Sequence, residues 1–489
     1  MARDFNRKQF LLIFGTLLLI EAAFMLMPAV VAIIYKEKDL WCLLTSAGVT
    51  GIAGLAGVLY GRKSNQQIGI RESYLLVGLV WIIFSIFGML PFVLSDSITT
   101  ITDAYFETMS GFTTTGATIL TDIDHMPKCL LFWRCLMQWI GGMGIMVFSM
   151  AVLPLFGSGM QLYKAEVTGP TYDKIQPRIK DTARLLWDIY IVLTLAQVGL
   201  LMLAGMDWFD SVCQSLSTMA TGGFSTKQAS IGYWSSPLIH YIIIVFMIIS
   251  SINFTLLYNA TIRHRFKMLF TDEEFRTMLR VIGVVTIYCF IGLIIDTHAS
   301  SAQGFEACFR NSLFHSISIV TTTGFCTDDY MAWPPALWVI LFLLTCAGGC
   351  AGSTSGGIKI IRLRIAFKNI IYEFKRVIHP KAIIPVRINH RVVPENIINN
   401  VHAFLAIFII IAVFSTIVLI ALGMTPVNAF GAAVSCLSNV GPALGDLGPA
   451  GTYVDVPTAG KWILSFLMLI GRLELFTILL LFSPEFWKR

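Results

Sequence analysis

The sequence Thr-Thr-Thr-Gly-Ala-Thr at residues 113–118 recurs in altered form three more times along the chain. The later copies are Met-Ala-Thr-Gly-Gly-Phe-Ser at 219–225, Thr-Thr-Thr-Gly-Phe at 321–325 and Ser-Asn-Val-Gly-Pro at 438–442. Aligned on the middle glycine, the four copies lie at Gly116, Gly222, Gly324 and Gly441. Copies at intervals of roughly 100 residues indicate that nearly the whole chain is one unit used four times.

Each copy follows a short amphipathic segment and lies between two long apolar runs. This order is typical of a re-entrant pore loop, because backbone outside a helix is tolerated at membrane depth only where it is buried or faces water. Four such loops predict a ring of carbonyl oxygens that replaces the hydration shell of a cation. The predicted filter residues are Thr114, Thr115, Gly116, Ala220, Thr221, Gly222, Thr322, Thr323, Gly324, Asn439, Val440 and Gly441.

The composition is that of a multi-span membrane protein. Of 489 residues, 56% are hydrophobic and only 13% are charged, and the mean hydropathy is +0.74, whereas a soluble domain carries about 25% charged residues. The net charge of +6 therefore has to be read loop by loop, and it does not indicate a nucleic-acid partner. The ten cysteines show no zinc or disulfide spacing and are interpreted as packing residues.

The expected fold class is an all-α membrane protein with two N-terminal spans and four repeats of helix, pore loop and helix, in a pseudo-fourfold arrangement around one pore. Ten spans are predicted, near residues 10–35, 41–61, 74–95, 130–156, 185–206, 238–262, 277–296, 336–365, 400–424 and 462–482. Pore helices are expected near 103–112 and from about Phe209, Phe305 and Val427. The corresponding division of the chain is 1–72, then 73–165, 166–270, 271–390 and 391–489.

Charge bias predicts the orientation. Lysine and arginine gather near both ends of the chain and in the loops at 62–71, 164–184, 263–280 and 359–391. By the positive-inside rule these segments and both termini are cytoplasmic, so the four filter loops enter from outside. The outer segments carry more aspartate, which predicts a vestibule that concentrates cations, although surface solvation explains any single aspartate equally well.

The second span of the third repeat contains the glycine-rich run Cys-Ala-Gly-Gly-Cys-Ala-Gly-Ser-Thr-Ser-Gly-Gly at 346–357. Five glycines in twelve residues do not hold a stable helix, and non-helical backbone below a filter is expected to face the pore. We interpret the run as a gate; the alternative is a close contact between helices. The predicted gate residues are Gly348, Gly349, Gly352, Ser353, Thr354, Gly356 and Gly357, together with Arg472 from the last span.

Arg472 lies within the apolar run of the last span, where a charge is costly and usually faces a cavity or a partner. Pointing into the pore it would repel cations. The alternative is an ion pair with Glu474 or with another helix, and Glu474 is a poor partner within one helix because residues two apart do not face each other.

Taken together, these motifs resemble the TrkH potassium-uptake family, whose relatives include KtrB subunits and plant HKT transporters. The resemblance covers essentially the whole chain and rests on the filter copies, Gln-Trp-Ile-Gly-Gly-Met-Gly at 138–144, the glycine-rich run through Lys359, and Gly-Arg-Leu-Glu at 471–474. It implies that K⁺ is the transported ion, with Rb⁺ and some Na⁺ accepted, and that the chain carries no cofactor of its own. It further implies a homodimer in the bacterial inner membrane and a cytosolic TrkA-type ring that binds nucleotides and controls the gate.

Two other hypotheses stay open at this stage. A proton- or sodium-coupled symporter needs a titratable group near the ion, and Glu21 and Asp188 are the candidates, both outside the filter. For Glu21 the alternative is a carboxyl bonded to a neighbouring helix. A membrane-embedded enzyme would need converging His, Asp, Glu or Cys, but the repeats place glycine and threonine there. No P-loop or Rossmann signature indicates a nucleotide site in the chain itself.

Overall fold

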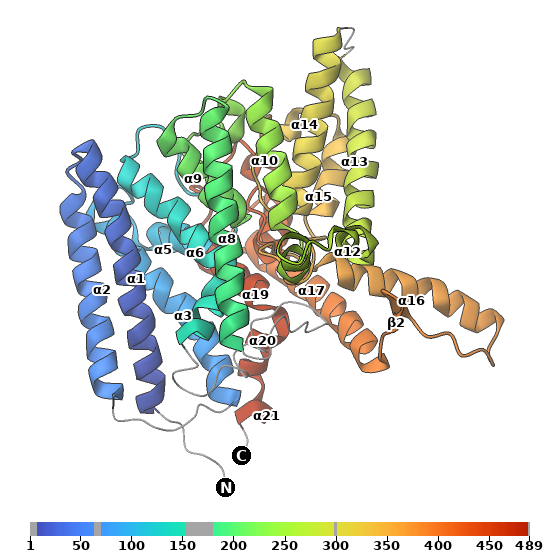
Figure 1. Cartoon of the computed structure of the whole chain (residues 1–489), viewed down its shortest axis with the longest axis horizontal. Coiled ribbons are helices and arrows are strands. Elements are labelled where there is room, and N and C mark those ends of the chain that lie inside the picture. The colour runs from blue at the N-terminus through green and yellow to red at the C-terminus, as the bar shows by residue number, and fades with distance from the viewer. Residues whose placement is uncertain (1–6, 63–69, 153–178, 298–300, 488–489) are drawn as a thin grey trace.

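The computed structural model describes residues 7–62, 70–152, 179–297 and 301–487. Two long antiparallel helices, α1 (Arg7–Tyr35) and α2 (Leu40–Gly61), pack together at one edge of the molecule (Figure 1). The other regular elements of the described chain are helices, apart from one two-stranded hairpin. The expected domain limit at 165/166 lies outside the described residues.

After α2 the same order of elements recurs four times: a long helix, a short helix, a non-helical segment and a further helix. The long helices are α3 (Ile70–Gly88, followed by α4, Leu90–Leu94), α8 (Ile179–Leu203), α13 (Glu273–Thr297) and α17 (Glu395–Ala421). The short helices are α5 (Ile101–Phe112), α9 (Trp208–Met219), α14 (Ala302–Val320) and α18 (Pro426–Ser438).

Each short helix begins at a polar residue whose side chain accepts a hydrogen bond from the first turn. These capping residues are Thr100, Asp207, Ser301 and Thr425. A cap of this kind satisfies one of the free N–H groups at a helix start and contributes about 1 kcal/mol. The short helices therefore have defined starting points, and each is followed at its C-terminal end by one of the four glycine segments.

The further helices are α6 (Lys128–Val152), α10 (Pro237–Ser250) with α11 (Phe254–Thr261), α15 (Pro335–Leu344) with α16 (Ile360–Ile378), and α19 (Thr458–Leu473) with α20 (Leu475–Leu479). Between them lie α12 (Phe266–Thr271) and the hairpin of β1 (Arg387–Ile388) and β2 (Arg391–Val392), and α21 (Pro484–Trp487) ends the described chain. The short 3₁₀ turns are η2 (Ser230–Tyr233), η3 (Tyr330–Ala332), η4 (Gly445–Leu447) and η5 (Leu480–Phe482).

All four of these further helices are broken, whereas the sequence predicts a break only in the third. Helix α6 is interrupted at Gly144, α10 and α11 meet at 107°, and the α19–α20 pair bends by 114°. Gly144, Lys359 and Glu474 share a left-handed φ, at 68°, 78° and 64°. Six described helices are long and apolar enough to cross a membrane, or eight if each bent pair is one span. This count leaves out α6 and the α15–α16 pair, which fall in two of the ten predicted spans.

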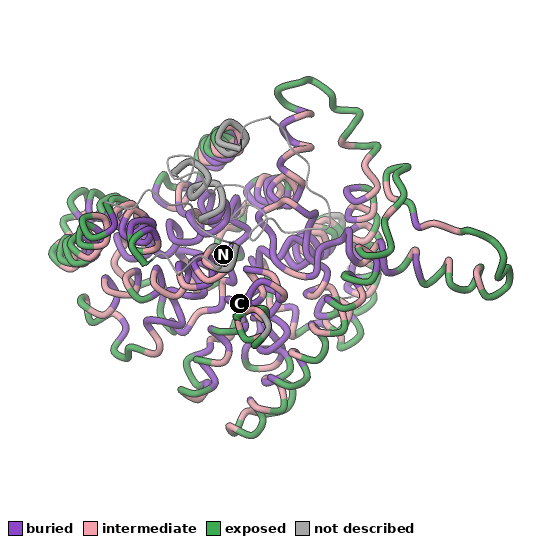
Figure 2. Tube along the Cα trace, turned by 90° about the horizontal axis from the view of Figure 1, so that it is seen from below, coloured by how far each residue is buried: buried purple, intermediate pink, exposed green. Residues whose placement is uncertain are grey.

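Buried residues concentrate at the centre of the molecule, where the non-helical segments meet, and exposed residues form the periphery (Figure 2). Many peripheral side chains are large and apolar, among them Leu203, Ile295 and Ile410. An apolar periphery around a polar centre is expected of a protein surrounded by lipid. The start of α1 and the short helix α21 lie at the same end of the molecule (Figure 1).

Candidate functional site: four glycine segments above a glycine-rich loop

The short helices end in one shared conformation. In each, a backbone N–H donates to the carbonyl of a serine five residues earlier, at 2.8–3.1 Å. The pairs are Thr115 to Ser110, Gly222 to Ser217, Thr323 to Ser318 and Val440 to Ser435. The residue just before each donor is left-handed: Thr114, Thr221, Thr322 and Asn439 have φ between 52° and 57°. A left-handed residue is a common way to end a helix.

The glycine that follows each donor also has a positive φ, and this corrects the alignment of the second copy. These glycines are Gly116, Gly223, Gly324 and Gly441, with φ between 79° and 97°. Gly223, not Gly222, is thus the equivalent of Gly116, and Ala220–Thr221–Gly222 shifts to Thr221–Gly222–Gly223. A serine lies six residues before each of these four glycines. This serine, which the sequence analysis does not use, identifies Gly223 rather than Gly222 as the equivalent position.

The four segments contact one another in a closed circle. A Cβ at Gly116 would overlap the carbonyl oxygen of Gly222, and one at Gly223 would overlap that of Thr323. A Cβ at Gly324 would overlap the Val440 carbonyl, and one at Gly441 would lie 2.6 Å from that of Thr115. Each glycine therefore faces the carbonyl that precedes the glycine of the next segment, and the fourth faces the first.

A cavity with an empty volume of about 540 Å³ lies against this circle. All four positive-φ glycines line it, while Gly222 does not. Its charged lining residues are Arg134 and Lys227. None of the aspartates expected to form an acidic vestibule lines the cavity, because described aspartates such as Asp329 and Asp207 bond to backbone N–H groups of their own segments.

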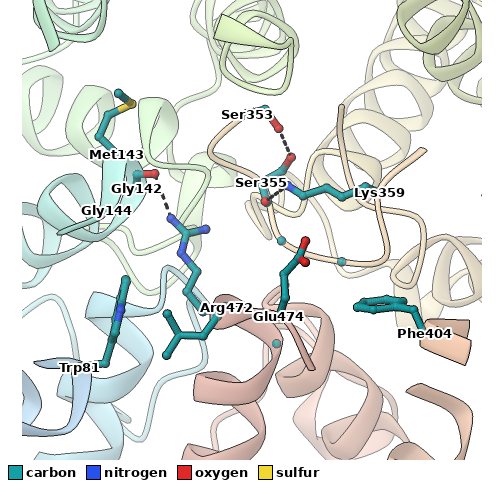
Figure 3. A pocket seen from close by; sticks show the side chains of 14 residues that line it. Trp81, Gly142, Met143, Gly144, Ser353, Ser355, Lys359, Phe404, Arg472 and Glu474 are labelled. Atoms are coloured by element: carbon teal, nitrogen blue, oxygen red, sulfur yellow. Dashed lines mark hydrogen bonds between the residues drawn. The ribbon is translucent and has the colours of Figure 1, made fainter. Parts of the chain in front are cut away.

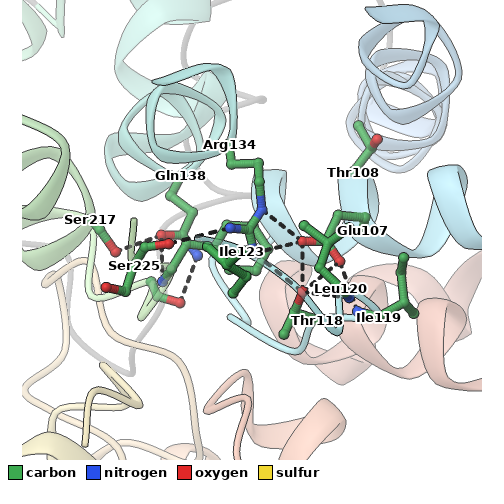
Figure 4. Close-up of polar contacts among 12 residues, drawn as sticks. Glu107, Thr108, Thr118, Ile119, Leu120, Ile123, Arg134, Gln138, Ser217 and Ser225 are labelled. Atoms are coloured by element: carbon green, nitrogen blue, oxygen red, sulfur yellow. Dashed lines mark hydrogen bonds and ion pairs between the residues drawn. The ribbon is translucent and has the colours of Figure 1, made fainter. Parts of the chain in front are cut away.

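Buried polar side chains support the first two segments from behind (Figure 4). Arg134 and Glu107 form an ion pair of 2.8 Å in which both side chains are fully buried. The Glu107 carboxylate also accepts from the Ile119 N–H at 3.0 Å, and Arg134 donates to the Ser225 carbonyl. A pair that bonds the backbone of both segments fixes their relative position, since a buried charge requires each of its partners.

Gln138 joins the second segment to the helix α6. Its amide nitrogen donates to the Gly222 carbonyl at 2.7 Å, and its amide oxygen accepts from the Phe224 N–H and the Ser217 hydroxyl. The sequence analysis includes Gln138 only within a family motif and misses Glu107 and Arg134. Opposite charges inside two consecutive apolar segments were the available signal.

A second cavity, with an empty volume of about 570 Å³, lies between the breaks in the further helices (Figure 3), and none of the four glycines of the circle lines it. Its lining includes Ser353, Gly356 and Gly357 of the glycine-rich run, and also Arg472. The run occupies the interval between α15 and α16, as the sequence predicts. The Gly356 N–H donates to the Thr322 hydroxyl at 2.7 Å, and the Thr354 hydroxyl donates to the Met219 carbonyl. The loop thus lies directly beneath the second and third segments.

Arg472 connects this loop to the opposite side of the cavity. Its guanidinium donates to the Thr354 carbonyl at 2.6 Å and to the carbonyls of Gly141 and Gly142 at 2.6 and 2.9 Å. Glu474 pairs with Arg362 of α16 at 2.7 Å. Arg472 therefore points into the cavity and donates to backbone carbonyls on both sides of it.

Two further side chains hold the back of the loop. Glu274, which is 7% exposed, accepts from the N–H groups of Ala351 at 2.7 Å and Ile361 at 3.1 Å. Asn253, at the break between α10 and α11, donates to the Ala351 carbonyl and caps α11 through Thr255. The bend at Asn253 is thus stabilised by contacts with the loop that no local pattern reveals.

The remaining candidates lie away from both cavities. Glu21 is buried on α1, with an oxygen near Gly88, and Asp188 is exposed on α8; neither lines a cavity described here. Cys346 and Cys350 are free thiols. Among the described residues no group of three or more His, Cys, Asp or Glu is placed to hold a metal ion.

Comparison with known proteins agrees with this architecture. Residues 44–489 match the family model described as "TrkH: Cation transport protein". The chain is 40% identical over 479 residues to the Trk system potassium uptake protein TrkH of Escherichia coli K12, covering 97% of this chain and 98% of that protein. It is 35% identical to the potassium uptake protein TrkG of the same organism. The crystal structure of the potassium transporter TrkH from Vibrio parahaemolyticus superposes with a TM-score of 0.88 at 37% identity, over 98% of this chain and 99% of that one.

Proposed function

The chain belongs to the TrkH family of cation transport proteins, and from this premise we propose that it takes up K⁺ through one pore in the bacterial inner membrane. Membership makes the protein a multi-pass membrane transporter and not an enzyme. In the proposal the four modules surround the pore with pseudo-fourfold symmetry, the two N-terminal helices lie outside it, and the transported K⁺ is cargo, not a resident cofactor.

The observation that carries the proposal is the closed circle of glycine segments. Four glycine segments contact one another in chain order and close a circle, as they must if backbone oxygens from all four are to surround a dehydrated cation. The ion-binding residues in this proposal are Thr114, Thr115, Gly116, Thr221, Gly222, Gly223, Thr322, Thr323, Gly324, Asn439, Val440 and Gly441. Rb⁺, which resembles K⁺ in size, is expected to pass, and Na⁺ to pass less well.

We propose that the glycine-rich loop and Arg472 form the gate. The loop lies between the filter and the second cavity, which is the inner cavity in the proposed orientation. Arg472 reaches across that cavity and donates to the Thr354 carbonyl of the loop and to the Gly141 carbonyl of α6. A guanidinium in the ion path also repels cations. When the gate opens, a membrane potential supplies about 2.3 kcal/mol per charge per 100 mV, which suffices for accumulation without a coupled ion.

A cytosolic TrkA-type ring is the proposed regulator, and a chain of contacts could carry its effect to the gate. Asn389 in the β1–β2 hairpin donates to Asp272 at 2.7 Å and accepts from the Glu273 N–H at 2.8 Å. Glu273 pairs with Lys368 of α16, and the next residue, Glu274, holds the loop. This proposal places the basic loops, the hairpin and both termini in the cytoplasm, and it includes a homodimer.

The alternative of a proton- or sodium-coupled symporter finds less support. Glu21 and Asp188, its candidate coupling groups, line neither described cavity. The proposed ion-binding residues are themselves not acidic, and the carboxylate behind them, Glu107, is already paired with Arg134.

Uptake of radiolabelled Rb⁺ into liposomes that contain the full chain tests the proposal, with an imposed K⁺ gradient and several outside pH values. The Arg472→Ala variant is included so that a closed gate does not hide transport. Competition by K⁺ over Na⁺ without dependence on the proton gradient is expected. Flux that follows a proton or sodium gradient would support the symporter, and absence of flux in both proteins would overturn the pore.

A further inference from the structure

The cavity that lies against the glycine circle is the outer cavity in the proposed orientation. Its charge is unexpected for the mouth of a cation pore. Two of its lining side chains are basic, Arg134 and Lys227, and none of its lining residues is acidic. Arg134 is neutralised by its buried pair with Glu107. The charge of Lys227 has no such counterpart, because no ion pair among the described residues includes it.

Lys227 is held at the cavity by its own turn. Its N–H donates to the Ser225 hydroxyl at 3.1 Å, and its carbonyl accepts from the Ser230 N–H at 3.0 Å. Its ammonium lies 4.7 Å from the centre of the Tyr233 ring. Such a cation–π contact positions a charge without cancelling it. Lys227 lies four residues after Gly223 and lines the same cavity, so a fixed positive charge lies beside the glycine circle.

The nearby acidic side chains have other partners. Asp210 accepts from the Thr226 hydroxyl at 2.7 Å, immediately before Lys227 in the chain. Asp328 accepts from the Trp333 indole, Asp329 from the Met331 N–H, and Asp446 from the Asn428 amide. These carboxylates stabilise the outer loops, and none of them lines the cavity.

We propose that Lys227 is a specificity-determining residue that excludes divalent cations from the outer mouth of the pore; this inference rests on the proposed function. An electrostatic energy is proportional to the charge of the ion, so a fixed positive charge opposes a divalent cation twice as strongly as K⁺. The factor by which the lysine lowers the occupancy of the mouth by a divalent ion is therefore the square of the factor for a monovalent ion. A single lysine therefore costs modest K⁺ affinity and gives larger protection against Mg²⁺ or Ca²⁺.

The expected size follows from Coulomb's law. For a separation of about 10 Å and an effective dielectric constant of about 40, the factor is about fourfold for a monovalent ion and about sixteenfold for a divalent one. Because mobile ions screen a partly exposed charge, both factors should shrink as ionic strength rises.

Spheroplasts of a strain without other K⁺ uptake systems provide the test, since their outer face is accessible. Initial uptake of radiolabelled Rb⁺ is measured against external Rb⁺, and its inhibition is measured against external Mg²⁺. The proteins are the native chain, Lys227→Gln, Lys227→Arg and the control Lys128→Gln. Lys128 is a matched control because its ammonium also lies over a tyrosine ring, that of Tyr35 at 3.9 Å, but it does not line the cavity.

We expect Lys227→Gln to lower the apparent KM for Rb⁺ about fourfold. With Rb⁺ kept well below KM, so that half-inhibition reports the binding of Mg²⁺ itself, it should lower the Mg²⁺ concentration for half-inhibition about sixteenfold. Lys227→Arg and Lys128→Gln should resemble the native chain. If Lys227→Gln folds poorly, the screening measurement on the native chain replaces it: raised ionic strength must lower the Mg²⁺ concentration for half-inhibition more than the KM for Rb⁺. Native uptake with no change in either Lys227 measurement would overturn this inference alone, whereas absence of native uptake would overturn the proposed pore.

Discussion

The glycine circle and the loop beneath it are built on opposite principles. In the circle, backbone carbonyls of one segment face the glycine of the next, and φ at Thr114, Thr221, Thr322 and Asn439 agrees to within a few degrees. In the loop, a single segment is held by three side chains: Glu274 of α13, Asn253 at the start of α11 and Arg472 of α19. The backbone contacts of the circle have no alternative partners. A side-chain hydrogen bond to a loop carbonyl, in contrast, can be replaced by a hydrogen bond to water.

This contrast fits the two tasks that we propose. A filter has to keep one geometry while ions pass, and a repeated backbone held from behind keeps it. A gate has to adopt two arrangements of similar free energy, so its contacts must be replaceable. Even the supports of the circle differ: Ser318 and Ser435 donate to the carbonyl after the glycine in their own segments, whereas the first two segments rely on the neighbouring helix α6.

The largest effect is expected from a Cβ in the circle. Gly223→Ala puts a methyl group into the Thr323 carbonyl and also requires an alanine at φ 81°, so we expect loss of K⁺-selective uptake. Gly222→Ala is the matched control, because the atoms nearest to its Cβ belong to the Gln138 side chain rather than to backbone, and it should retain partial uptake. Rb⁺ uptake competed by K⁺ and Na⁺ distinguishes the two. A stronger defect in Gly222→Ala would restore the original alignment.

These two adjacent glycines also mark the limit of prediction from sequence. Helical class, the four glycine copies and the interrupted third module follow from apolar runs and glycine content, which are local. The register of the second copy does not, because two neighbouring glycines fit equally well until the preceding serine is considered. The bends at Asn253 and Glu474 were missed because Asn253 bonds to Ala351 and Glu474 to Arg362, each about a hundred residues away in sequence.

The next largest effect concerns the support behind the circle. Glu107→Gln leaves the Arg134 guanidinium buried without its counter-charge, and breaking such a pair typically costs about 3–5 kcal/mol of folding free energy. We expect a clear drop in the thermal unfolding temperature in detergent. Adding Arg134→Met to Glu107→Gln removes the unpaired charge and should recover part of the loss. Equal stability of native and Glu107→Gln proteins would show that the pair does not hold the segments.

A smaller effect of opposite sign is expected in the gate. Arg472→Ala removes three hydrogen bonds that join Thr354 to Gly141 and Gly142. Water replaces much of their energy, so we expect a shift of about 1.4 kcal/mol toward the open loop and about a tenfold increase in Rb⁺ flux. The K⁺ over Na⁺ preference should stay native, because the circle is untouched. A change in selectivity without a change in flux would place Arg472 in the filter instead.

The smallest expected effect is at the back of the loop, where Glu274 accepts from two backbone N–H groups. Both N–H groups bond the same carboxylate oxygen, Oε1. Glu274→Gln can therefore keep both bonds but loses the negative charge that strengthens them, so we expect a flux increase of a fewfold without partner proteins. Glu306→Gln is the control, since Glu306 pairs with Arg310 away from the loop. If Glu274→Gln and Arg472→Ala raise flux additively, the two anchors act independently. If the double variant leaks no more than Arg472→Ala, release of the arginine already frees the whole loop, and the gate moves as one unit.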